Sequence, residues 1–258
     1  MYIVRADRIW SYGASVSPST LSATYVAAWL CDGRTRPIRS VNGSFNATIT
    51  HQGASAAQPV NCVILSHTNF DEGLNVSIGG DIMPQTFVSP AATPPDDIPY
   101  SGVLFPSGGF SVTSWTLAMS GNSKDIIIGE AVAGLADYLK LPVFRSDADG
   151  IRDFTRPMDM DLASIWPYDP KHGGRQPFKG RWLMSEVEYQ EMVDVFLAQR
   201  NGTRPMFLIP DENVNDARMV FMSAPRFSGY ERPDSDPNFR LRFVDLEFAE
   251  VPRHRWPL

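Results

Sequence analysis

Residues 111–119 read Ser-Val-Thr-Ser-Trp-Thr-Leu-Ala-Met, a run in which large apolar residues alternate with small or polar ones. Trp115, Leu117 and Met119 fall on one side of an extended chain, and the residues between them fall on the other. This period of two predicts a half-buried strand with one core face and one solvent face. We therefore expect a fold built mainly from β-strands.

Similar short segments surround this strand and are separated by turn signals at Asp32-Gly33, Asn42-Gly43, Gly79-Gly80 and Gly121-Asn122. Residues 60–65 are almost continuously apolar, which indicates a strand covered on both faces. Many short strands at this spacing are typical of a β-sandwich or barrel. The predicted strands of this part are Ile3–Ala6, Ala23–Leu30, Ser44–Thr50, Asn61–Ser66, Leu74–Ile78, Gly102–Phe105, Ser111–Met119 and Asp125–Glu130.

Composition divides the 258 residues into two parts. The first 145 residues contain 18 charged side chains and the remaining 113 contain 34, although the chain as a whole is 20% charged and 43% hydrophobic. A shift of this size predicts a unit at 1–145 and a second, smaller α+β unit at 146–258. Residues 84–99, with five prolines, predict a long loop, and residues 145–180 predict a second irregular stretch.

One helix is predicted in the second unit, at about 185–200. Ser185 is the expected N-cap, and Glu188 completes a capping box three residues later. Tyr189, Met192, Val193, Phe196 and Leu197 follow helical spacing and predict one apolar stripe. Strands are then expected at Pro205–Ile209, Arg218–Ala224 and Arg240–Glu250, and the last of these is expected to change register near Val244-Asp245 through a bulge.

No motif for catalysis is present. The sequence lacks a Gly-x-Ser-x-Gly elbow, a zinc-spaced histidine pair and a phosphate-binding glycine loop. We therefore assign no catalytic residue, cofactor or metal, and expect a protein that is not an enzyme. A hydrolase that uses Asp159, Asp161 and His67 stays as an alternative, although His67 is better explained as a hydrogen-bonded histidine at a strand end.

Large aromatic and arginine side chains gather in and around the irregular stretch of the second unit. Leaving an aromatic ring exposed to water costs about 25 cal/mol for each Å² of apolar surface that is not buried. Two interpretations stay open: the rings form a lid on the helix, or they anchor a subunit interface, where aromatic and arginine residues are enriched. The candidate interface residues are Trp166, Tyr168, Arg175, Phe178, Arg181, Trp182, Arg204 and Trp256.

The overall charge, the hydropathy and the cysteines indicate which partners and which cellular compartment to expect. A net charge of −6 gives no electrostatic reason for direct nucleic-acid binding. No window of 18 apolar residues predicts a membrane span, and Arg5, Asp7 and Arg8 interrupt any signal-like start, so we expect synthesis in a cytoplasm. Cys31 and Cys62 lie in apolar runs and are expected to be reduced and buried, with a bridge between them left open.

The first unit resembles the discoidin-type, galactose-binding-like jelly roll. The resemblance rests on residues 25–52 (YVAAWLCDGRTRPIRSVNGSFNATITHQ), residues 58–69 (QPVNCVILSHTN) and a closing strand at 124–134 (KDIIIGEAVAG). It implies a jelly-roll β-sandwich. The family's usual Trp after the Asp-Gly loop is replaced here by Ile38-Arg39-Ser40, which counts against carbohydrate binding but not against the fold.

The second unit is similar to the C-terminal part of minor tail and distal-tail proteins of long-tailed bacteriophages. The similar features are a polar stretch, one helix, an apolar run flanked by proline (RPMFLIPD) and a final strand (RFVDLEFAEVP). The resemblance implies a virion structural protein of the tail tip or baseplate. It would be assembled in the host cytoplasm into symmetric rings or adaptors with other copies and other tail proteins. The alternative is a carbohydrate-binding module that attaches the particle to a host surface glycan.

Overall fold

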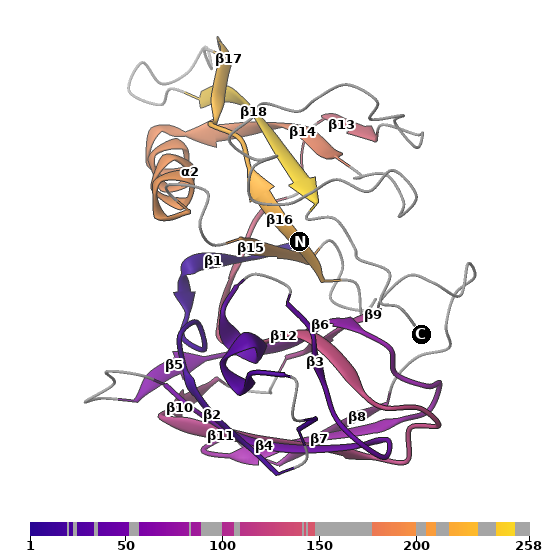
Figure 1. Cartoon of the computed structure of the whole chain (residues 1–258). Helices are drawn as coiled ribbons and strands as arrows, with labels where there is room; N and C mark the ends of the chain where they lie inside the picture. The colour runs from indigo at the N-terminus through magenta and orange to yellow at the C-terminus, as the bar shows by residue number, and fades with distance from the viewer. Residues whose placement is uncertain are drawn as a thin grey trace.

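The fold is mainly β, with antiparallel sheets and one α-helix in the described part of a computed structural model (Figure 1). The structure describes residues 1–19, 21–22, 25–33, 36–51, 57–82, 84–88, 100–105, 109–140, 142, 144–147, 177–199, 205–209, 217–231 and 241–250. Its elements are β1 (Tyr2–Ile9), β2 (Ser15–Pro18), the 3₁₀ helix η1 (Ala27–Cys31), β3 (Ile38–Arg39), β4 (Ser44–Thr50), β5 (Gln58–Val60), β6 (Cys62–Thr68), β7 (Asn75–Gly80), β8 (Gln85–Val88), β9 (Tyr100–Leu104), β10 (Phe110–Val112), β11 (Ser114–Ser120), β12 (Ile127–Tyr138), β13 (Phe144–Asp147), β14 (Pro177–Ser185), α2 (Glu186–Ala198), β15 (Met206–Ile209), β16 (Arg218–Met222), β17 (Arg226–Glu231) and β18 (Leu241–Glu250).

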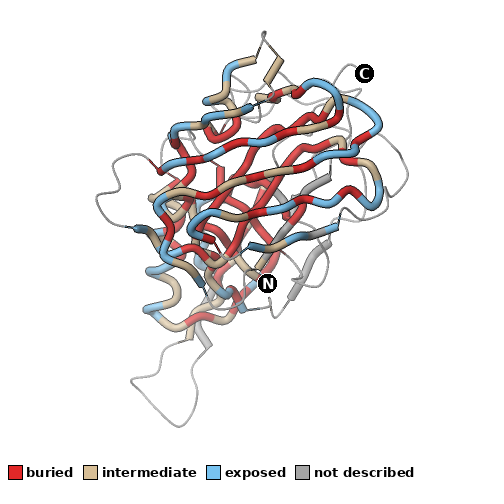
Figure 2. The backbone as a smooth tube through the Cα atoms, turned by 90° about the horizontal axis from the view of Figure 1, so that it is seen from below, coloured by how far each residue is buried: buried red, intermediate tan, exposed pale blue. Residues whose placement is uncertain are grey.

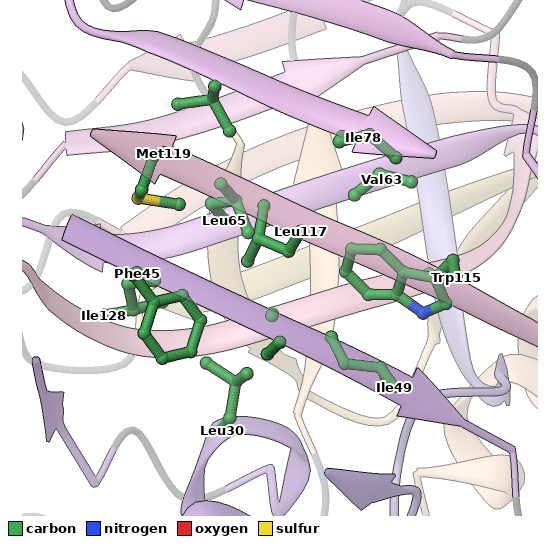
Figure 3. Packing of buried hydrophobic residues seen from close by; sticks show 14 of the residues in the cluster. Leu30, Phe45, Ile49, Val63, Leu65, Ile78, Trp115, Leu117, Met119 and Ile128 are labelled. Atoms are coloured by element: carbon green, nitrogen blue, oxygen red, sulfur yellow. The ribbon is translucent and has the colours of Figure 1, made fainter. Parts of the chain in front are cut away.

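A five-stranded sheet in the order β2-β4-β11-β7-β8 forms one layer of a sandwich, at the bottom of Figure 1. Its inner side chains, among them Phe45, Ile49, Trp115 and Leu117, pack in one buried cluster with residues of β6 and β12, such as Leu65 (Figure 3). The predicted alternation of β11 is confirmed, since Trp115, Leu117 and Met119 are buried and the residues between them are not.

The second layer contains β6, and all seven residues of this strand are buried, as its continuous apolar run predicts. Val63 and Leu65 face the sandwich core, whereas Cys62 and Ile64 belong to a second buried cluster with Val4 and Phe207. A strand covered on both faces has no solvent side, so it carries no polar alternation. Cys31 and Cys62 are both buried free thiols.

The sheet of this second layer continues across residue 145. Its main path is β13-β14-β18-β16-β15-β1-β12-β6-β9, with β3 paired to β12 and β17 paired to β18. The N-terminal strand makes the connection, because Tyr2 pairs with Tyr138 of β12 on one side and with Ile209 of β15 on the other. The division into units at 1–145 and 146–258 stays a prediction, but backbone hydrogen bonds join the two segments.

Helix α2 begins where the sequence predicts. Ser185 is the N-cap, and its side chain accepts a hydrogen bond from the Glu188 amide while the Glu188 carboxylate accepts one from the Ser185 amide. The predicted apolar stripe is confirmed in part: Met192 is buried, and Tyr189 and Phe196 pack against the same cluster. Leu197 is exposed instead, and Val195, which the stripe did not include, is buried. The helix packs on β1, β14 and β18, and Met192 and Val195 belong to the buried cluster that these strands form.

Two predictions in the sandwich need correction, one of a strand and one of a loop. The segment predicted as a strand at Ala23–Leu30 contains η1, because two apolar residues in succession, Leu30 and Cys31, both turn into the core. The predicted loop at 84–99 begins instead with edge strand β8, which pairs with β7. Pro84 precedes this strand without interrupting it, and an edge strand needs ladder partners on one side only. Residues 89–99 lie outside the described residues.

Two predictions in the second part also need correction. Residues 145–180 include β13 and the start of β14, rather than being wholly irregular. The expected bulge near Val244-Asp245 is absent from the pairing of β18 with β14, which is regular from Leu241 to Ala249. The register shift lies in β17, between Phe227 and Gly229, so the extra residue belongs to the partner strand.

Candidate functional site

Four side chains around η1 form a cluster at the surface of the sandwich, and we call Tyr25, Trp29, Asp32 and Arg36 the aromatic–arginine cluster. Tyr25 and Trp29 are four residues apart, and their rings meet edge to face with centroids 6.3 Å apart. The Arg36 guanidinium carbon lies 5.3 Å from the centroid of the Trp29 ring, and its Nη2 lies 2.6 Å from Oδ2 of Asp32. Each group therefore restricts the orientation of the next.

The cluster is fixed to the core from beneath. Leu30 and Cys31 are fully buried, and the amide of Gly33 donates a 3.0 Å hydrogen bond to the carboxylate of Glu130 on β12. Gly33 has φ +73°, and a Cβ there would press on the Tyr12 ring at 3.3 Å, so the Asp32-Gly33 turn requires glycine. The sequence places this rigid support directly under the exposed groups.

Burial also changes the chemistry of the thiol beneath the cluster. Desolvation raises the pKa of Cys31 well above its usual range, and the Glu130 and Asp32 carboxylates raise it further. The second thiol behaves similarly, because burial raises the pKa of Cys62 to about 12. Both thiols are therefore protonated at neutral pH and unsuited to nucleophilic or metal chemistry.

The side chains of the cluster are only partly accessible, and the buried Oδ2 atom of Asp32 faces Arg36 rather than solvent. The Arg36 side chain is 42% exposed and Asp32 is 17% exposed. The guanidinium offers donors and the carboxylate offers acceptors, while the half-buried indole offers apolar surface. Hydroxyl groups both donate and accept, so one ligand hydroxyl could bind to Arg36 and its neighbour to Asp32.

The predicted interface residues lie mostly elsewhere. Trp166, Tyr168, Arg175, Arg204 and Trp256 fall outside the described residues, and of Phe178 only the place in β14 is described. Arg181 is exposed and pairs with Asp245 on β18, where Nε lies 2.7 Å from Oδ1, and this hydrogen bond raises the pKa of Arg181.

Trp182 does not belong to an exposed surface, which corrects its assignment as an interface residue. Its side chain is 1% exposed and packs edge to face on Phe248, with ring centroids 6.5 Å apart. Its Nε1 donates to the Lys140 carbonyl at 2.8 Å. The reason is local: residues 177–185 are a strand, whose alternation points Gly180, Trp182 and Met184 toward the core.

His67 is buried at the end of β6, with φ +56°, and its Nδ1 lies 2.6 Å from Oγ of Ser66. This agrees with a hydrogen-bonded strand-end histidine. Asp159 and Asp161, its suggested partners in a hydrolase, lie outside the described residues. Among the side chains that are described, no group of three or more His, Cys, Asp or Glu is placed to hold a metal ion.

Sequence reasoning did not select the aromatic–arginine cluster, although it marked the Asp32-Gly33 turn. The available signals were the spacing of four between Tyr25 and Trp29 and between Asp32 and Arg36. The assignment of a strand to Ala23–Leu30 concealed the first of these signals, because a strand holds positions four apart too far from each other for their side chains to meet.

Comparison with known proteins gives structural likeness only. No family model and no curated protein matches the sequence. The crystal structure of SpGH29 is similar at TM-score 0.40 and 12% identity, over 52% of this chain and 29% of SpGH29. The family 32 carbohydrate-binding module of NanJ from C. perfringens, in complex with galactose, is similar at TM-score 0.38 and 9% identity, over 53% and 100% of the chains. The lectin domain of Lectinolysin, in complex with Lewis B antigen, is similar at TM-score 0.37 and 8% identity, over 48% and 93%.

In the described part of the chain, no helix has the length and hydropathy needed to cross a bilayer.

Proposed function

We propose that this chain is a carbohydrate-binding module without catalytic activity, and that it binds a saccharide at the aromatic–arginine cluster. The observation that carries the proposal is the surface triad of Trp29, Asp32 and Arg36. The triad combines a ring, an acceptor and a donor that are already held together by contacts of 5.3 and 2.6 Å. Side chains that are ordered before binding lose less conformational entropy when the ligand binds, and this smaller loss increases the affinity.

Replacement of Arg36 tests this proposal. Arg36→Ala should weaken saccharide binding at least tenfold, because it removes the donor fork and releases both Asp32 and the Trp29 ring. The measurement is a glycan array with the intact chain, followed by calorimetric titration of the best saccharide against the parent and the variant.

A matched control is available at Arg39, three residues later in the chain and on strand β3. Arg39 also pairs with an aspartate, at 3.0 Å to Asp125, and its side chain is 41% exposed. Arg39→Ala should therefore keep full affinity. An Arg36→Ala variant that is folded and binds like the parent would remove the cluster as the site.

A second candidate function is structural: a subunit of a bacteriophage tail tip that contacts other copies and other tail proteins. It is favoured by a stack near α2, where the Arg242 guanidinium lies 5.1 Å from the Tyr189 ring centroid and 5.3 Å from that of Phe227. Phe227 is 44% exposed, and Val187 on the helix is 68% exposed. Exposed aromatic and arginine groups are typical anchors of protein interfaces.

This second candidate predicts association of the purified chain. Light scattering after size exclusion at micromolar concentration should give a mass that is a multiple of 28.7 kDa. Phe227→Ser should shift it toward the single chain, because the replacement removes the exposed ring. A monomeric parent across this concentration range would contradict self-assembly through this surface.

A further inference from the structure

The outer face of the five-stranded sheet is built from strands that carry no charged side chain. Figure 2 views the molecule from the side of this sheet, and its strands alternate there between buried and exposed residues. The strands read SVSP, SFNATIT, SWTLAMS, NVSIGG and QTFV, without one Asp, Glu, Lys, Arg or His. By comparison, the chain as a whole is 20% charged.

The outward side chains form rows of small hydrogen-bonding groups across the strands. One row joins Asn46 of β4, Ala118 of β11, Ser77 of β7 and Thr86 of β8, which are direct partners in the pairing. The Oγ atoms of Ser77 and Thr86 lie 3.4 Å apart. Neighbouring side chains on such a face repeat about every 4.8 Å across the strands and about every 6.8 Å along them.

The face is slightly hollowed at this row. A shallow depression of about 320 Å³ is lined by Asn46, Asn75, Ser77, Ala118 and Ser120, with parts of Ser44, Phe45 and Met119. Its size is at the lower end of small-ligand sites. Ala118 is the smallest residue of the row and lies on the central strand β11. Its short side chain leaves the depression at the middle of the sheet.

Other exposed strands of the same protein are covered differently. On β14 and β18, Lys179 pairs with Glu247 at 2.8 Å and Arg181 pairs with Asp245 at 2.7 Å, across adjacent strands. These ion pairs represent an ordinary solvated sheet surface. Among the described side chains of its strands, the neutral face has neither this cover nor the aromatic or arginine anchors expected of a protein interface. It also lacks the positive charge that nucleic acid requires.

We propose that the outer face of the five-stranded sheet binds an extended chain of a neutral polysaccharide. Hydroxyl and amide side chains both donate and accept, which matches a ligand made of hydroxyl groups. A neutral ligand brings no charge that must be paired when water is displaced from the face. An anionic chain would lose its hydration there and find no cationic side chain on these strands to pair with. The inference rests on the proposed carbohydrate-binding function and adds a second surface and the class of ligand.

Ala118→Glu tests the neutral face, since it fills the hollow and introduces a charge on a side chain that can extend into solvent. The probes are six-unit fragments of a neutral glucan, a neutral galactan and an acidic polyuronate. The intact chain should bind a neutral fragment and not the polyuronate. Ala118→Glu should weaken the neutral affinity at least tenfold, and Ala118→Gln, of the same size without charge, should weaken it less. Gln190→Glu on α2 adds the same charge far from the face and should change nothing.

The outcomes separate this inference from the proposed function. If the parent binds no saccharide, both are overturned. If Arg36→Ala abolishes binding and a folded Ala118→Glu variant binds like the parent, carbohydrate binding stands and the sheet face is overturned. If Ala118→Glu abolishes binding and Arg36→Ala does not, the sheet face is supported and the cluster is not the site. A parent that is dimeric and becomes monomeric on Ala118→Glu would overturn the inference, because the face would then be a contact between copies.

Discussion

Trp182→Ala should lose about 4 kcal/mol of the free energy of unfolding, the usual range for removal of a large aromatic side chain from a core. The ring lies over Gly180, where a Cβ would come within 2.6 Å of it, and packs on Phe248. The replacement also leaves the Lys140 carbonyl without its 2.8 Å donor. Chemical denaturation of the parent and the variant, monitored by circular dichroism, measures the loss.

Arg181 provides the control on the same strand. Its side chain points outward and is 46% exposed, so Arg181→Ala should leave the free energy of unfolding close to that of the parent, as is usual for exposed ion pairs. Comparable small effects at both positions would show that Trp182 is not part of the core. The contrast between neighbouring residues makes this a test of the strand's alternation.

Gly43→Ala should be about as damaging, with a loss of about 4 kcal/mol or more. Asn42 and Gly43 have φ +62° and +60° and form the tight turn between β3 and β4. A Cβ on Gly43 would overlap the carbonyl oxygen of Asn122. That backbone cannot move easily, because the Asn122 amide donates to the Gly43 carbonyl at 3.2 Å and its Oδ1 accepts from the Asp71 amide at 2.7 Å.

Gly121→Ala separates the two causes of this loss. Gly121 also has a positive φ, +94°, but nothing lies within 4 Å of a Cβ built there. The free energy of unfolding of Gly121→Ala should therefore fall by only about 1–2 kcal/mol, the cost of a left-handed conformation for a residue with a Cβ. Equal losses from the two variants, measured by the same denaturation, would contradict close packing between the turn at 41–43 and the segment at 121–125.

The strands of the sandwich and helix α2 could be predicted because their signals are local. Trp115, Leu117 and Met119 alternate within one strand, and Ser185 and Glu188 cap a helix three residues apart. The same kind of signal was present in residues 179–184, where Lys179 and Arg181 alternate with Gly180 and Trp182. It was missed because prolines and glycines nearby favoured a loop.

The candidate site could be predicted only in part. The Asp32-Gly33 turn was marked by its sequence, and Arg36 is close to it in the chain. The contact of Arg36 with the Trp29 ring depends on η1, which forms because Leu30 and Cys31 both fit into the core. The support from Glu130 comes from a strand about 100 residues later.

By itself, the sequence determined that the chain is mainly β, where most of its sandwich strands lie, and that the segments 15–18, 44–50, 75–80, 85–88 and 114–120 contain no charged residue. Only the tertiary structure decided that those five segments form one sheet with one neutral face. It also decided that β1 pairs with both β12 and β15, which joins segments about 200 residues apart. The reason is that alternation is set by neighbouring residues, whereas the partner of a strand is set by which distant apolar faces bury one another.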